Sequence, residues 1–224
     1  MSNPEEHYEV SRAALLAGKM TLETPPYDGG PRYGISAVLR PASAITEELE
    51  CVRREIAEFT GPGQWWLEAR SIHVTLRSLE PHSTRSFDSD ARFAAYVAAL
   101  DEAVSGFPPV ELELRGFGPH PGGVVLYGHC GRGVLPGLRE RYVDALDARG
   151  VVHHEANFVR DLWYCSLVQF ASPVRDVTAL LAWGEANRDR LVGTAVHYEV
   201  DIMRWRYRDG TMKAELLYTA KLDG

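Results

Sequence analysis

The feature that most constrains this chain is a short strand pattern that occurs twice, each time with two polar side chains spaced two residues apart. The first copy carries His73 and Thr75 between apolar residues, and the second carries Tyr164 and Ser166 in the same arrangement. Side chains at i and i+2 of a strand point to the same face. Each copy therefore predicts a strand with one polar and one apolar face.

The residues around these strands predict the same order of elements in each half: a helix, the strand with the polar pair, a second helix and a hairpin. An internal duplication on this scale determines the fold class. We expect an α+β fold with two pseudo-symmetric lobes of antiparallel sheet, helices on the outer faces and a central cleft. The expected elements are strands at 33–40, 72–79 and 162–170, helices at 41–59, 90–104, 135–148 and 172–190, and hairpins at 110–130 and 197–222.

The N-terminal segment differs in character from the repeated body. Asn3, Pro4 and Glu6 have the spacing of a helix start, and the helix should end near Gly18. Prolines and glycines then follow closely and predict a turn-rich linker. We therefore predict an N-terminal helix and linker over residues 1–32 and a single two-lobed domain over residues 33–224.

Composition narrows the class of protein. With 224 residues and 45% hydrophobic content the chain can bury a substantial core. A net charge of −7 argues against an extended nucleic-acid surface but leaves room for a small basic pocket. The three cysteines form no Cys-x-x-Cys pair, and the sequence has neither a signal peptide nor an apolar run long enough to span a membrane. We expect a soluble, cytoplasmic protein without membrane contact.

The first polar pair has the chemistry of a phosphate site. Regular strand alternation would place Arg77 on the same face as His73 and Thr75. An imidazole can carry a proton, a hydroxyl can donate a hydrogen bond, and a guanidinium supplies fixed positive charge. Arg77 could neutralise a phosphate or lie at the rim of the cleft.

Three runs of the sequence resemble the 2H phosphoesterase superfamily, which includes the bacterial 2′-5′ RNA ligase-like proteins and 2′,3′-cyclic nucleotide phosphodiesterases. The runs lie at residues 66–79, 112–118 and 124–127, and the resemblance extends over roughly residues 33 to 222. It implies two His-x-Thr/Ser motifs that face each other across the cleft without a metal or cofactor. One histidine would draw a proton from water, the other would protonate the departing ribose oxygen, and the hydroxyls would bind the phosphate.

The match is complete at His73 and Thr75 but not in the second motif. Ser166 matches the second hydroxyl, whereas Tyr164 stands where the resemblance implies a histidine. An imidazole ordinarily has a pKa of about 6.5 and a phenol one of about 10, so a tyrosine suits donation better than proton abstraction. The site implied is His73 and Tyr164 as catalytic residues, with Thr75, Ser166 and Arg77 binding the phosphate.

Three functions remain open at this point. The first is a metal-independent phosphodiesterase that acts on a cyclic or 2′-5′-linked ribonucleotide or a related small phosphate ester. The second is a nucleotide- or metabolite-binding protein in which Tyr164 marks lost catalysis. The third is an enzyme of specialised metabolism that uses the cleft for other acid–base chemistry. In each case the partner is a small molecule or a short nucleotide, and the oligomeric state is left open.

Other residues that carry reactive groups receive structural interpretations. The run His153-His154-Glu155 suggests metal ligands, but adjacent histidines on an extended segment point apart and no third ligand has suitable spacing. We predict a solvated loop there and no metal site. Cys165 alternates away from Ser166 and is expected to be a core thiol. Trp65 and Trp66 are predicted to pack beside the motif strand, with stacking on a base as the alternative.

Overall fold

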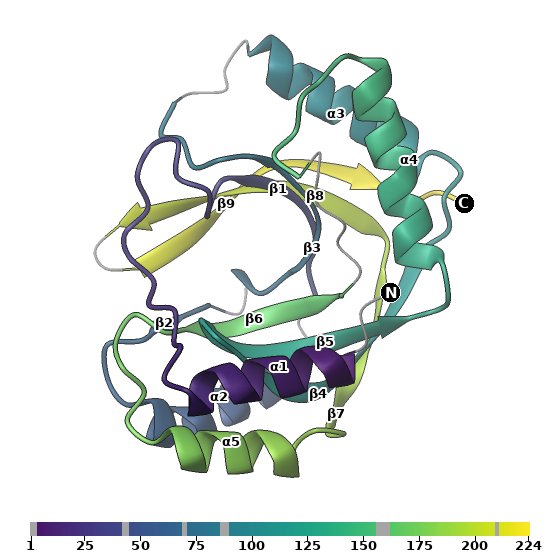
Figure 1. Ribbon diagram of the computed structural model, residues 1–224. Coiled ribbons are helices and arrows are strands. Elements are labelled where there is room, and N and C mark those ends of the chain that lie inside the picture. Colours follow the sequence, from purple (N-terminus) through teal and green to yellow (C-terminus); the bar gives the residue numbers. More distant parts are fainter. Residues whose placement is uncertain (1–3, 42–44, 69–70, 86–89, 156–161, 209–210) are drawn as a thin grey trace.

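The computed structural model describes residues 4–41, 45–68, 71–85, 90–155, 162–208 and 211–224. Over these ranges the strands form one curled antiparallel sheet (Figure 1). They are β1 (Ile35–Leu39), β2 (Trp65–Trp66), β3 (Val74–Glu80), β4 (Val110–His120), β5 (Gly123–Cys130), β6 (Tyr164–Gln169), β7 (Leu191–His197), β8 (Glu199–Arg208) and β9 (Thr211–Lys221). Their order is β7-β4-β5-β6-β3-β1-β8-β9, and β2 pairs with β6 outside this path.

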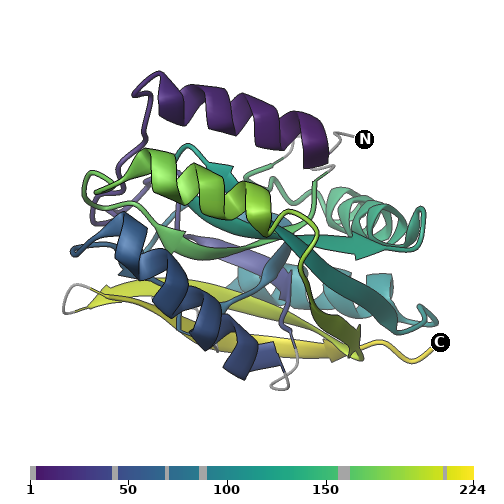
Figure 2. The same cartoon turned by 90° about the horizontal axis from the view of Figure 1, so that it is seen from below.

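The sheet has two lobes, and each lobe is covered by its own helices. The helices are α1 (Pro4–Leu16), α2 (Thr46–Thr60), α3 (Ala91–Val104), α4 (Val134–Ala148) and α5 (Val177–Ala186). The first lobe comprises β3, β1, β8 and β9 with α3 and α4, and the second comprises β7, β4, β5 and β6 with α1, α2 and α5. Seen from below, α1, α5 and α2 lie side by side (Figure 2). The predicted α+β fold with two sheet lobes and outer helices is confirmed.

The two lobes meet where β3 and β6 pair only briefly. Val74 and Cys165 are the one registered pair between these strands, whereas β8 and β9 pair along almost their whole length. Both residues of the pair are fully buried and belong to the main hydrophobic core. The strands that carry the two polar motifs therefore touch at one point and diverge from it.

Aspartate side chains explain where two of the helices begin. The Asp90 carboxylate accepts hydrogen bonds from the backbone N–H groups of Arg92 and Phe93 at the start of α3. Asp176 accepts from the N–H of Ala179 at the start of α5 in the same way. An aspartate N-cap satisfies amide groups that have no partner within the helix.

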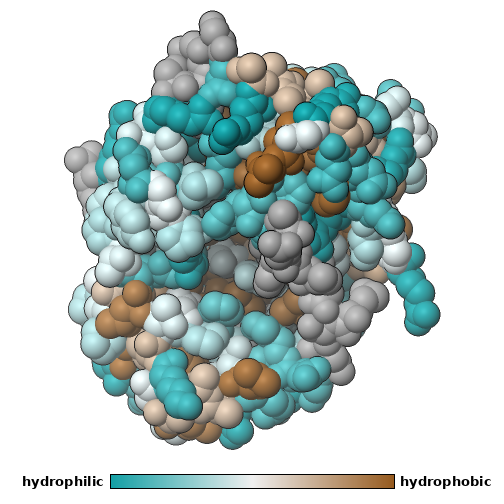
Figure 3. Space-filling view, turned by 45° about the horizontal axis from the view of Figure 1, so that its top comes forward, coloured by the Kyte–Doolittle hydropathy of each residue, from teal (hydrophilic) through white to brown (hydrophobic). Residues whose placement is uncertain are grey.

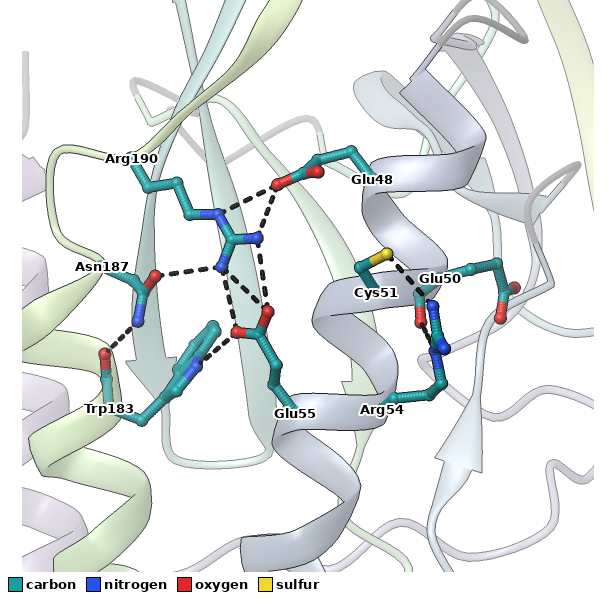
Figure 4. Close-up of polar contacts among 8 residues, drawn as sticks. All are labelled: Glu48, Glu50, Cys51, Arg54, Glu55, Trp183, Asn187 and Arg190. Atoms are coloured by element: carbon teal, nitrogen blue, oxygen red, sulfur yellow. Dashed lines mark hydrogen bonds and ion pairs between the residues drawn. The ribbon is translucent and has the colours of Figure 1, made fainter.

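An arginine fixes α2 against the end of α5. Arg190 follows α5 and donates hydrogen bonds to Glu48 and Glu55 of α2 (Figure 4). These hydrogen bonds lower the pKa of Glu55, to which the indole N–H of Trp183 also donates. The predicted helix at 172–190 was too long at both ends, because the chain must turn after Ala186 to place Arg190 and to begin β7. Strand β7 is an edge strand that the sequence analysis did not predict.

The N-terminal segment is held on both lobes. The N–H of Thr21 donates to the carbonyl of Pro121, and the N–H of Glu23 donates to that of Phe170, so this part follows the second lobe. Farther along, Gly29 and Gly30 exchange backbone hydrogen bonds with His82, just after β3 of the first lobe. The linker thus crosses from one lobe to the other. Asn3, the predicted cap of α1, lies outside the described residues.

None of the helices in the described ranges has the length and apolar character needed to cross a membrane.

Glycine at position 123 allows β5 to approach β6 closely. A Cβ atom there would lie 2.2 Å from the carbonyl oxygen of Val168, a backbone atom that cannot easily move. We therefore expect Gly123→Ala to lower the free energy of unfolding by about 1–3 kcal/mol, measured by urea denaturation. Gly137 in α4 is the matched control, because its added Cβ would meet nothing within 4 Å. Gly137→Ala should raise stability by about 0.5–1 kcal/mol, and equal effects at both positions would contradict the close approach.

Candidate active site

The two lobes enclose a cavity of about 420 Å³, and the space-filling view shows the surface hollowed between them (Figure 3). Four predicted site residues line this cavity: His73, Thr75, Tyr164 and Ser166. Neighbouring walls are supplied by the linker, by β8 and β9, and by the chain before β6. The remaining lining residues among those described are Pro31, Arg32, Tyr33, Gly34, Ser36, Leu67, Ser78, His154, Glu155, Gln169, Trp205 and Met212.

The strand junction sets how the two polar pairs face each other. Val74 pairs with Cys165 in antiparallel register. The four polar residues are the immediate neighbours of this pair along the two strands, so the junction brings both motifs to the same cavity. All four side chains are half-buried, which leaves them accessible from the cavity.

The imidazole of His73 is oriented by its own loop. Its Nδ1 lies 2.7 Å from the carbonyl oxygen of Ser71, which can only accept a hydrogen bond. Nδ1 therefore carries the proton, and in the neutral ring Nε2 carries the lone pair. The ring also packs against the indole of Trp205, with 4.6 Å between centroids. This is the tautomer that a general base acting through Nε2 needs.

Arg77 does not lie on the face that regular alternation predicts. Ala37 pairs with Arg77 but the next residue, Val38, pairs with Thr75, so β3 has a bulge between them. The bulge places Ser78 in the cavity wall and turns Arg77 toward the interior, where it is buried. The expected shared face of His73 and Arg77 is therefore wrong.

Arg77 instead holds one wall of the cavity in place. Its guanidinium donates to Nδ1 of His153, with a shortest distance of 2.8 Å, and to the carbonyl oxygen of Glu155 at 2.6 Å. The Glu155 carboxylate accepts a hydrogen bond from the N–H of Ser78. The predicted solvated loop at 153–155 is also wrong, because His153 and Glu155 are buried and only His154 is exposed. Burial, together with the charge of Arg77, lowers the pKa of His153.

The end of the linker and the residue after it contribute cavity-lining side chains that were not predicted as site residues. Tyr33 has a φ of 61°, an uncommon left-handed conformation for a residue other than glycine. This turn places Tyr33 on the cavity wall, where its hydroxyl donates to the Gln169 side chain on β6. Arg32 beside it forms an ion pair with the buried Glu23. Among the described lining residues, Arg32 is the only one with a permanent positive charge.

The first lobe gives the cavity an apolar, aromatic side. Val38, Met203, Trp205 and Met212 form a buried cluster separate from the main core, and Tyr33, Trp65 and Tyr207 pack against it. The ring of Trp65 lies 5.2 Å from that of Tyr207 and 6.2 Å from that of Tyr33. Trp66 packs instead against the main core, beneath the guanidinium of Arg53. Trp65 thus packs against the small apolar cluster, and Trp66 packs against the main core.

Two histidines distant in sequence surround Tyr164. His120 at the end of β4 and His7 of α1 each lie with ring centroids 6.3 Å from that of Tyr164. The Nδ1 atom of His7 also lies 3.2 Å from the hydroxyl oxygen of Tyr127 on β5. No spacing in the sequence connects these residues, because the contacts depend on how α1 lies against β4. No group of three or more potential metal ligands occurs among the described residues.

No model of a known protein family matches this chain, and no curated protein sequence matches it significantly. Solved structures do. A phosphoesterase superposes with a TM-score of 0.60 at 15% identity, covering 86% of this chain and 99% of its own. The TT0787 protein of Thermus thermophilus gives 0.59 at 14% identity, over 84% of this chain and 97% of its own.

The LigT protein of E. coli is a further structural relative. Its complex with 3′-AMP superposes with a TM-score of 0.58 at 14% identity, covering 86% of this chain and 99% of LigT. Other LigT structures contain phosphate or ATP. At such low identity these similarities show that the chain has the fold of the phosphoesterase and LigT structures.

Cys165 lies on the face of β6 opposite to Tyr164 and Ser166. It is fully buried, and burial raises the pKa of its thiol to about 12. We expect iodoacetamide at pH 8 to label Cys51 and Cys130, which are half-exposed, and to spare Cys165 in the folded protein. Peptide mapping by mass spectrometry would measure this. Labelling of Cys165 at the same rate in folded and urea-unfolded protein would contradict its place in the core.

Proposed function

We propose that this protein is a metal-independent phosphodiesterase that acts on a cyclic or 2′-5′-linked ribonucleotide or a related small phosphate ester. The observation that carries the proposal is the arrangement of four side chains in one cavity, His73 with Thr75 and Tyr164 with Ser166. The pairing of Val74 with Cys165, which brings the two motifs together, supports it. The fold shared with LigT, which has been solved with 3′-AMP, supports it further.

In the proposed reaction His73 is the general base. Its Nδ1–H donates to the carbonyl of Ser71, which keeps Nε2 as the proton acceptor. Nε2 takes a proton from water, and the water oxygen forms a bond to phosphorus. The same hydrogen bond from Nδ1–H to the carbonyl of Ser71 also stabilises the imidazolium that forms when Nε2 accepts the proton. Positioned general bases contribute about 10²–10⁴-fold in rate.

Tyr164 is proposed to serve the departing oxygen. As the bond from phosphorus to a ribose oxygen breaks, the phenol donates its proton to that oxygen. Afterwards Tyr164 regains a proton and the His73 imidazolium releases one, by exchange with solvent. The hydroxyls of Thr75 and Ser166 donate hydrogen bonds to the phosphoryl oxygens. Arg77 enters the proposal indirectly, because it holds the wall formed by Glu155 rather than reaching into the cavity.

The shape of the cavity favours a small substrate. Its volume of about 420 Å³ is at the low end for ligand pockets, which usually hold 300–1,000 Å³. Trp205 and Tyr33 line the cavity and offer aromatic surface for a base. The net charge of −7 disfavours an extended nucleic acid. A mononucleotide or short oligonucleotide fits these properties.

The two motif residues make separate contributions that substitution can distinguish. We expect His73→Ala to lower kcat/KM by about 10²–10⁴-fold on a panel of 2′,3′-cyclic nucleotides, because the base is lost. Tyr164→Phe should weaken turnover without abolishing it. His129→Ala is the control, since His129 is exposed on β5 and hydrogen-bonds only to the carbonyl of Arg115 among the described contacts. Full activity in the His73 variant would rule out the mechanism.

A second function, binding without turnover, is favoured by one observation. A phenol, not an imidazole, occupies the second motif, so the acid that would expel the ribose oxygen is weaker. If this function is correct, calorimetry with 3′-AMP and with cyclic nucleotides will give binding heats while no product forms. Tyr164→His should then introduce hydrolysis. Product formation by the wild-type protein at a rate that depends on His73 would exclude this function.

A further inference from the structure

A small recess continues the cavity beyond Tyr164. It has a volume of about 20 Å³, which holds one water-sized group rather than a whole phosphate. Four of its lining residues also line the main cavity: Arg32, Tyr164, Ser166 and Gln169. His120 lines the recess but not the main cavity, so the recess adds an imidazole next to Tyr164 and Ser166.

The polar groups around the recess are mostly hydrogen-bond donors. Arg32 carries a positive charge, which it shares with its ion-pair partner Glu23. Tyr164 and Ser166 have hydroxyls, and Gln169 has an amide. No carboxylate is among the described residues that line it. A site of this size and character suits a single anionic oxygen, such as one phosphoryl oxygen of a bound ester.

The proton on His120 can be placed from its backbone contact. The N–H of Gly122, in the turn between β4 and β5, donates to Nδ1 of His120 at 3.1 Å. Nδ1 therefore carries the lone pair, and Nε2 carries the proton on the opposite edge of the ring. Burial, and next the nearby His7, lower the pKa of His120 to about 4, so the ring is neutral at pH 7.

We infer that His120 donates a hydrogen bond from Nε2 to an oxygen of the bound phosphate, beside Tyr164 and Ser166. The inference rests on the phosphate site of the proposed function but not on turnover. His120 keeps its proton, and the proton for the departing oxygen stays with Tyr164. A fixed N–H donor aimed at a developing charge contributes about 10²–10³-fold in kcat.

His7 holds the ring of His120 in place. The two imidazoles stack with centroids 5.7 Å apart and an interplanar angle of 26°. His7 is in turn anchored to Tyr127, and Tyr127 packs over Gly118, where an added Cβ would lie 2.4 Å from the phenol oxygen. Helix α1 thereby acts on the site from outside the repeated body.

Two substitutions at position 120 separate the effect of the hydrogen-bond donor from the effect of the size of the side chain. His120→Leu removes the donor and should lower kcat/KM on 2′,3′-cyclic nucleotides by about 10²-fold. His120→Gln restores an N–H near the position of Nε2 and should recover most of that loss. His129→Leu is the matched control and should stay within about twofold of wild type. Circular dichroism must show unchanged melting for each variant that is compared.

A direct measurement does not depend on catalysis. In ¹⁵N-histidine side-chain spectra, the His120 signals, assigned by their loss in His120→Gln, should show the Nε2–H form in the free protein. Inorganic phosphate should shift them. His7→Ala should mix the two ring forms of His120, and His7→Phe, which preserves stacking, should restore the single form.

The outcomes separate this inference from the proposed function. Phosphate-induced shifts at His120 in a protein without turnover would support the inference and refute the phosphodiesterase. Normal turnover in a folded His120→Leu variant would overturn the inference and leave the phosphodiesterase standing. Phosphate that shifts His73 but not His120, or that binds nowhere, would also overturn it.

Discussion

The single registered pair between β3 and β6 is the constraint on which the site depends. Val74 and Cys165 are buried in the main core and fix where the two motif strands meet. One pair sets the orientation of both motifs and still leaves room between them for a ligand.

The cavity has unlike sides because the two lobes use their concave faces differently. The first lobe presents a buried apolar cluster and aromatic rings around Trp205. The second presents Tyr164, Ser166 and Gln169, with His120 beyond them. A molecule with a flat apolar part and an anionic part would satisfy both sides at once. A nucleotide has this division, which is consistent with the substrate class proposed above.

The sequence predicted those parts of the fold that depend on local patterns. Alternation revealed the motif strands, and the helix predicted to begin at about residue 90 does begin there, after the Asp90 cap. The helix predicted from residue 172 begins later, after the Asp176 cap. The sequence analysis missed β7, an edge strand with mixed burial, and it placed Arg77 on the wrong face because a bulge is not visible in alternation alone. Arg32 reaches the cavity through the turn that follows the linker, His120 reaches the recess at the end of β4, and His7 stacks on His120 through packing of α1. No periodicity in the sequence records such contacts.

The linker that crosses between the lobes restrains how far they can move apart. It is hydrogen-bonded to Pro121 and Phe170 on one side and to His82 on the other, and the hydroxyl of Tyr33, which follows it, donates to Gln169 on β6. Spreading the lobes would break these bonds together. The N-terminal segment therefore acts as a brace, although it lies outside the strands that carry the two motifs.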